Sequence, residues 1–252
     1  MDLGLKDARC VVTGGSRGIG LASAEVLLAE GATVLIAARR RASVDPALAS
    51  LASGGPVLGE ACDLSEEGDV VRLISSARTR MGGIDVLVAN AGIVGTPSPL
   101  SEMPTADWDE LMATNLRGTF IACREASAAM RADGIAGRIV IVGSATAFHA
   151  ESDSGHYNTA KAGLLGLTRS LAVDLARWGI RVNCVAPGLT ETDQTREYIK
   201  AGIHPAALGR AGQAREIAAA ICFLAGDSCG FVTGSTLVVD GGEIVKGPEA
   251  PQ

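Results

Sequence analysis

Short apolar runs and longer helical patterns alternate along this chain of 252 residues from one end to the other. Seven runs have the near-continuous hydrophobicity of strands in a parallel sheet covered on both faces: residues 9–13, 33–38, 57–62, 84–89, 138–143, 180–186 and 236–239. Five helical patterns lie between them: residues 18–30, 65–81, 106–131, 157–178 and 214–225. This alternation predicts a doubly wound α/β fold, with a seven-stranded parallel sheet and helices on both faces.

A single domain accounts for the whole chain, residues 1–252, because α/β domains reach about 250 residues. No linker, internal repeat or low-complexity tract interrupts the alternation. The segment after Gly242 is short and contains Pro and Gly. Residues 243–252 are therefore predicted to form a flexible tail.

Charge and composition exclude several classes of function. The net charge is −6 and the only basic cluster is Arg39-Arg40-Arg41, which argues against a nucleic-acid partner. No stretch is long and apolar enough to cross a membrane, and the first residues do not resemble a signal peptide. The six dispersed cysteines favour buried free thiols over disulfides or a metal site. We therefore expect a cytoplasmic protein with no membrane association and no metal.

A glycine-rich segment joins the first predicted strand to the first predicted helix, in a chain with 32 glycines. It reads Thr13-Gly14-Gly15-Ser16-Arg17-Gly18-Ile19-Gly20. Glycines at such a position let the backbone turn sharply and approach a pyrophosphate, which the free N–H groups of the helix attract. A turn without a ligand is the alternative, but the context favours a Rossmann-type dinucleotide site. Its contacts are Gly14, Ser16, Arg17, Gly18, Ile19 and Gly20.

The end of the second predicted strand indicates which dinucleotide binds. An acidic residue usually stands there when the ribose carries no phosphate. This chain has Ala38 followed by three arginines instead. Guanidinium groups pair well with phosphate, so Arg39, assisted by Arg17, favours NADP(H) over NAD(H). A solvated basic turn is the alternative.

Tyr157 and Lys161 are four residues apart at the start of a predicted helix, so both side chains lie on one helical face. A free tyrosine has a pKa near 10 and exchanges protons poorly at neutral pH. A nearby ammonium favours the phenolate, so we expect Lys161 to lower the pKa of Tyr157 and make it a general acid and base. An exposed helix pair is the alternative.

With these motifs the chain resembles the short-chain dehydrogenase/reductase family over essentially its whole length. The motif sequences are similar to those of the family's 3-oxoacyl-[acyl-carrier-protein] reductases. Six further segments match the family in order. They are Cys62-Asp63-Leu64 at the adenine, Ala89-Asn90-Ala91-Gly92 at the ribose, Asn115 and Ser144 in the catalytic tetrad, Pro187-Gly188-Leu189-Thr190-Glu191-Thr192 over the nicotinamide, and the C-terminal Val239-Asp240-Gly241-Gly242.

The resemblance implies a role for each of these residues. Ser144 would hydrogen-bond the substrate oxygen, Tyr157 would transfer the proton, and Lys161 would also bind the nicotinamide ribose. Asn115 would hold a water that links the lysine to solvent. Asp63, Leu64, Asn90, Ala91, Gly92, Pro187, Gly188, Thr190 and Thr192 would contact the cofactor. His149, His156 and Tyr198 have no assigned role, although residues 193–209 would form the substrate lid.

The expected activity is reversible NADP(H)-dependent reduction of a small-molecule carbonyl to an alcohol. The alternatives are a 3-oxoacyl-[acyl-carrier-protein] reductase, an NAD-dependent alcohol dehydrogenase and a noncatalytic nucleotide sensor. Enzymes that bind an acidic carrier protein are expected to present basic residues at two positions where this chain has Ile135 and Trp178. Arg131, Arg138 and Arg181 are near in sequence and could take their place. The resemblance also implies a homotetramer, or a homodimer, in which helices 106–131 and 157–178 pack between subunits.

Overall fold

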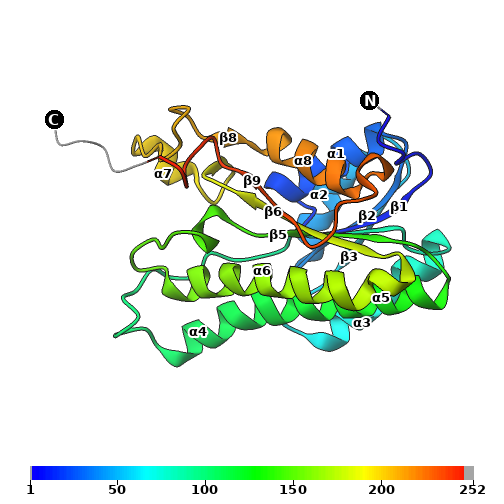
Figure 1. Ribbon diagram of the computed structural model, residues 1–252, viewed down its shortest axis with the longest axis horizontal. Coiled ribbons are helices and arrows are strands. Elements are labelled where there is room, and N and C mark those ends of the chain that lie inside the picture. Colours follow the sequence, from blue (N-terminus) through cyan, green and yellow to red (C-terminus); the bar gives the residue numbers. More distant parts are fainter. Residues whose placement is uncertain (1, 247–252) are drawn as a thin grey trace.

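The computed structural model describes residues 2–246, which form a three-layer α/β domain (Figure 1). The central sheet contains seven parallel strands, as the sequence predicts, and their order is β3-β2-β1-β4-β5-β6-β9. These strands are β1 (Arg9–Thr13), β2 (Thr33–Ala38), β3 (Val57–Ala61), β4 (Val86–Ala89), β5 (Arg138–Val142), β6 (Arg181–Pro187) and β9 (Thr236–Val239). The strand order reverses direction between β1 and β4, which is where ligands bind in open α/β sheets.

Helices cover both faces of the sheet, because alternate strand residues point to opposite sides. Val11 of β1 belongs to the core shared with α3 (Glu67–Met81), α5 (Thr119–Ala132) and α6 (Gly155–Leu175), whereas Val12 belongs to the core shared with α1 (Gly18–Ala29), α2 (Arg41–Leu51) and α8 (Ala214–Ala225). Both faces of the strands are therefore apolar. This explains why their sequences read as continuous hydrophobic runs.

The structure differs from the sequence prediction where the local pattern is weak. The predicted helix 106–131 is divided into α4 (Thr105–Met112), a π-helical turn at Ala113–Gly118, and α5. Three short elements within residues 190–213 were not predicted: β7 (Thr190–Glu191), α7 (Arg196–Lys200) and β8 (Gly212–Gln213). The two strands pair with each other in parallel. Helix α2 was also missed, and it contains Pro46.

The predicted tail begins too early. The side chain of Glu243 is only 6% exposed, and its Oε2 accepts a hydrogen bond from the Leu189 N–H at 3.1 Å. Residues 247–252 of that prediction lie outside the described residues. All six cysteines are buried and free, as expected. Within residues 2–246, none of the helices combines the length and apolar character needed to cross a bilayer.

Candidate active site

A cleft with a volume of about 690 Å³ opens at the carboxyl ends of β1, β2, β4, β5 and β6. It gathers nearly all the site residues predicted from the sequence. The lining includes Gly14, Ser16, Arg17, Gly18, Ile19, Arg39, Asp63, Leu64, Asn90, Ala91, Gly92, Ser144, Tyr157, Lys161, Pro187, Gly188, Thr190 and Thr192. Gly20 and Asn115 do not line the cleft, but both contact residues that do.

The glycine loop needs its glycines for two different reasons. Gly14 and Gly18 adopt positive φ angles of 66° and 54°, which residues with a side chain rarely tolerate. Gly20 has an ordinary φ, but a Cβ there would lie 2.2 Å from the Gly14 carbonyl oxygen and 2.5 Å from Asn90 Nδ2. The loop is therefore folded tightly against the start of α1 and presents backbone to the cleft, a form that fits a pyrophosphate.

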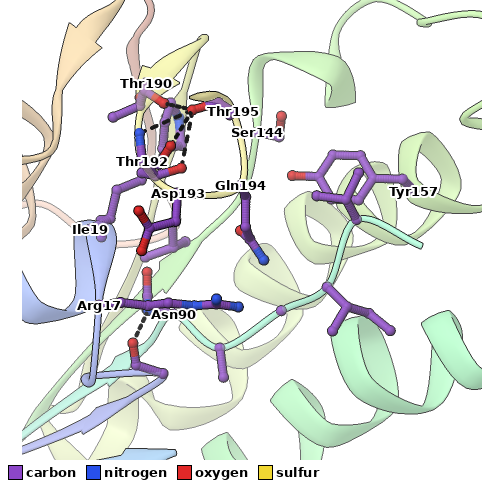
Figure 2. Close-up of a pocket in the computed structure, with 18 of the residues that line it drawn as sticks. Arg17, Ile19, Asn90, Ser144, Tyr157, Thr190, Thr192, Asp193, Gln194 and Thr195 are labelled. Atoms are coloured by element: carbon purple, nitrogen blue, oxygen red, sulfur yellow. Dashed lines mark hydrogen bonds between the residues drawn. The ribbon is translucent and has the colours of Figure 1, made fainter. Parts of the chain in front are cut away.

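Thr13 and Asn90 hold this loop in place from the ends of β1 and β4. The buried Thr13 Oγ1 accepts hydrogen bonds from the N–H groups of Asn90 and Ala91, both at 3.1 Å. Asn90 Nδ2 donates to the carbonyls of Thr13 at 3.0 Å and Gly14 at 3.2 Å. The Asn90 amide thus supports the glycine loop, as well as lying in the cleft wall (Figure 2).

The three consecutive arginines have different environments. Arg41 belongs to α2, where it pairs with Asp45 at 2.7 Å and donates to the Gly59 carbonyl at 3.3 Å. Arg39 and Arg40 line the cleft, as does Arg17, and no carboxylate of residues 2–246 pairs with any of these three. Unpaired guanidinium groups beside a glycine loop form a donor set that fits phosphate.

Ser144 lies next to the hydroxyl of Tyr157 in the wall of the cleft (Figure 2). Ser144 follows β5, and its Oγ accepts hydrogen bonds from the Thr146 N–H at 3.2 Å and the Thr146 hydroxyl at 3.0 Å. A hydroxyl has two acceptor sites and one proton. With both acceptor sites used, Ser144 is left to act as a donor, and sequence analysis gave no signal for the role of Thr146.

Lys161 lies one helical turn after Tyr157 on α6 and is buried. Its Nζ donates to the Val142 carbonyl at 3.0 Å and lies 5.5 Å from the centroid of the Tyr157 ring. Burial lowers the pKa of Lys161 to about 8, since an ammonium is poorly solvated there.

The expected lowering of the Tyr157 pKa is absent from this structure. Burial raises the pKa of Tyr157 to about 12, and the hydrogen bond with Ser144 offsets only part of that effect. Lys161 Nζ lies 5.5 Å from the ring centroid, and the charge of Lys161 is not among the causes that shift the Tyr157 pKa. Tyr157 is therefore a protonated phenol at neutral pH, suited to giving a proton.

Asn115 lies in the π-helical turn between α4 and α5, with its side chain buried. Its Oδ1 accepts from the Ile93 N–H, and its Nδ2 donates to the Ile93 carbonyl, both at 2.8 Å. The amide clamps the loop that follows β4, which forms one wall of the cleft. The structure thus gives the Asn115 side chain a positioning contact with the backbone of Ile93.

The segment after β6 is built on threonine hydroxyls. Thr190 Oγ1 donates to the Gly188 carbonyl at 2.9 Å, and Thr195 Oγ1 accepts from the Thr192 N–H at 3.0 Å and also donates to the Thr190 carbonyl (Figure 2). Thr195 was not predicted, because no motif includes it. Tyr198, which belongs to the predicted lid segment, lies in α7 and lines the cleft.

A family model described as "Enoyl-(Acyl carrier protein) reductase" matches residues 14–243. Similar proteins include cis-4-hydroxycyclohexanecarboxylate dehydrogenase of Sinomonas cyclohexanicum, 39% identical with 92% of this chain and 94% of that protein covered. The 3-oxoacyl-[acyl-carrier-protein] reductase of Escherichia coli (strain K12) is also 39% identical, with 92% and 95% covered. Dehydrogenase/reductase SDR family member 4 of Bos taurus is 35% identical, with 93% and 86% covered.

Solved structures of short-chain dehydrogenases resemble this chain in fold and in sequence. A short-chain dehydrogenase from Burkholderia cenocepacia J2315 in complex with NADP has a TM-score of 0.87 and 32% identity, covering 96% of this chain and 99% of that chain. A short-chain type dehydrogenase/reductase from Mycobacterium marinum has a TM-score of 0.92 and 31% identity, covering 96% and 97%.

Proposed function

Because the chain belongs to the short-chain dehydrogenase/reductase family, we propose that it is an NADP(H)-dependent oxidoreductase that reduces a carbonyl to an alcohol, reversibly, with Tyr157 as general acid and base. The observation that carries this proposal is the shared cleft, in which Ser144, Tyr157 and Lys161 lie at one end of the cavity that the glycine loop lines. The residues proposed to hold the cofactor and those proposed to transfer the proton therefore line the same cleft.

The residues divide into holding and reacting groups. Gly14, Gly18 and the start of α1 would hold the pyrophosphate, and the unpaired Arg39 and Arg40 would hold a 2′-phosphate. A bound nicotinamide supplies the hydride. The NADP complex of the Burkholderia relative supports this choice of cofactor.

The proton steps fall to this chain's own groups. Ser144, whose acceptor sites are taken by Thr146, donates a hydrogen bond to the substrate oxygen. Tyr157 gives its proton to the same oxygen as negative charge develops there. Its pKa, raised by burial to about 12, keeps it protonated at neutral pH, the form that gives a proton.

The acyl-carrier alternative keeps some support from the Escherichia coli relative. The guanidinium carbons of Arg131 and Arg177 lie over Trp178, at 4.1 and 4.0 Å from its ring centroids. Arg138 and Arg181 are engaged by other groups of the protein and do not join Arg131 and Arg177 at Trp178. Arg138 pairs with Asp227, while Arg181 donates to the carbonyls of Leu224, Gly226 and Val232. The NAD-dependent and noncatalytic alternatives lack a specific supporting observation.

Replacing Arg39 tests the cofactor assignment. We expect Arg39→Asp to lower the ratio of kcat/KM for NADPH over NADH by about tenfold or more, the effect of losing one charge-assisted hydrogen bond to phosphate. Steady-state kinetics with both cofactors measure this ratio. Arg41→Ala is the matched control, because Arg41 is paired with Asp45 and should leave the preference unchanged. An unaltered ratio in Arg39→Asp would refute the assignment.

A further inference from the structure

Two carboxylates, Glu151 and Glu243, line the same cleft as Tyr157, with His149 beside them. Ligand atoms of the three side chains lie within 4.8 Å of one another. His149 and Glu151 come from the segment between Ser144 and Tyr157, whereas Glu243 comes from the turn after β9. The charge of Glu151 contributes to raising the pKa of Tyr157, which puts this acidic corner within electrostatic reach of the reacting phenol.

Glu243 is held in position by the turn that carries it. Asp240 accepts hydrogen bonds from the N–H groups of Gly242 and Ile244, both at 2.8 Å, and Gly241 and Gly242 adopt positive φ angles of 62° and 85°. A Cβ on Gly188 would lie 2.6 Å from Glu243 Oε2, so the glycine there makes room for the carboxylate. This side chain is a fixed part of the cleft wall, unlike the exposed Glu151.

The hydrogen-bonding capacity of Glu243 is only partly used. A carboxylate offers about four acceptor positions. Oε2 accepts from the Leu189 N–H at 3.1 Å, and Oε1 lies 3.4 Å from His149 Nε2. Burial and the charges of Glu151 and Asp240 raise the pKa of Glu243, while the Leu189 N–H and His149 lower it. A donor from a bound molecule would therefore relieve an under-solvated carboxylate.

The cationic residues of the cleft lie elsewhere. Arg17, Arg39 and Arg40 belong to the glycine loop and the end of β2, and the buried Lys161 points to the Val142 carbonyl. An anionic group placed beside Glu243 would meet like charges without a guanidinium partner, whereas an ammonium or hydroxyl would find acceptors.

We propose that Glu243 is a specificity-determining residue, selecting substrates that carry a hydrogen-bond donor, above all an ammonium group, away from the reacting carbon and rejecting those that carry a carboxylate there. This inference rests on the proposed function, which places the substrate beside Tyr157. It assigns the substrate class as amino- or hydroxy-substituted carbonyl compounds.

Binding of unreactive ligands tests this independently of turnover. The dissociation constants of 4-methylbenzylammonium and 4-methylbenzoate are measured by calorimetry on the protein with NADP bound, in buffer containing EDTA so that no divalent cation occupies the three side chains. We expect the wild-type protein to prefer the ammonium by about tenfold or more, the strength of one charge-assisted hydrogen bond. Glu243→Gln should reduce that preference to within about threefold.

Two further variants keep the test sharp. Glu243→Asp retains the charge and should retain the ammonium preference, and Glu102→Gln, an exposed acid that does not line the cleft, controls for net charge. Matched 4-substituted acetophenones then report kcat/KM, where the preference should appear mainly in KM. A wild-type protein that binds both ligands equally, or favours the carboxylate, overturns the inference without any variant. An intact binding preference with no carbonyl turnover overturns the proposed function instead.

Discussion

Tyr157 and Lys161 have pKa values that follow from burial more than from their neighbours. Tyr157 is raised to about 12 and Lys161 lowered to about 8, in both cases because the charged form is poorly solvated. The spacing of Tyr157 and Lys161 made their shared location predictable from sequence. Their pKa values were not predictable, because these depend on how closely β5 and α6 enclose the two head groups.

The buried lysine should cost stability. With a pKa near 10.5 in the unfolded chain and about 8 in the folded one, the penalty is about 3 kcal/mol at neutral pH. We expect Lys161→Met to increase the free energy of unfolding at pH 7 by about 1–3 kcal/mol, with part of the gain lost because the Val142 carbonyl loses its donor. Activity should fall in the same variant.

The pH dependence gives the sign of this effect. Below pH 8 the folded protein carries the full penalty, and the penalty fades as the pH rises toward 10.5, where the unfolded lysine also loses its proton. The difference between variant and wild type should therefore shrink across that range in urea unfolding experiments. Lys200→Met is the control, because Lys200 is exposed and paired with Glu197. A Lys161→Met protein less stable than wild type at pH 7 would contradict this account.

Other residues of the site could not be found from sequence. Thr146, Thr195 and Glu243 belong to no motif, and each acts through a contact made by folding. Glu243 is the clearest example, since its segment looked like a tail and its partner Leu189 is far away in the chain.

At the level of elements, the strands were predicted well because burial on both faces leaves a continuous apolar run. Helices were predicted where glycine ends them, as at Gly82, the left-handed residue that caps α3. Helix α2 was missed because Pro46, which usually interrupts helices, lies inside it. The π-helical turn at Ala113–Gly118 was missed because an extra residue in one turn leaves no mark on a helical pattern.

The π-helical turn places the Asn115 side chain against the backbone of Ile93. Asn115→Ala would leave the Ile93 N–H and carbonyl without their partners, so we expect the free energy of unfolding to fall by about 2 kcal/mol or more. The loop after β4 should loosen and kcat should fall, as measured by urea unfolding and steady-state kinetics.

Asn183→Ala is the matched control for this variant. Asn183 is equally buried and also bridges two backbone groups, the Val232 carbonyl and the Ser235 N–H, but these partners do not line the cleft, whereas Ile93 does. It should lose similar stability and keep its kcat below the unfolding temperature. Equal losses of kcat in both variants would mean that Asn115 has no specific role in positioning the cleft.

The whole domain keeps apolar side chains at its surface. Phe231 and Val173 are fully or largely exposed, at 105% and 78%, and Phe120 of α5 and Leu237 of the edge strand β9 are partly exposed. Val173 and Phe120 lie on the two long helices that the family resemblance places between subunits. An exposed edge strand and apolar helix faces are costly in a monomer.

We therefore expect a homotetramer, which light scattering should report as a mass of about 102 kDa from chains of 25.6 kDa. Val173→Glu and Leu237→Glu should each lower the mass by disrupting one contact. A mass that stays near one chain at micromolar concentration would contradict this prediction, and a stable dimer would restrict assembly to one of the two surfaces.

The central claim is that Tyr157 gives a proton to a carbonyl oxygen while NADPH gives the hydride. Single-turnover loss of NADPH absorbance, with a panel of ketones, quinones and 3-oxoacyl thioesters, tests it most directly in the wild type and in Tyr157→Phe. We predict turnover of at least one carbonyl class by the wild type, and a rate lower by about a hundredfold or more in Tyr157→Phe with NADPH binding unchanged. A Tyr157→Phe protein that matches the wild-type rate, or a wild type that binds NADPH and oxidises none of it with any carbonyl, would contradict the account.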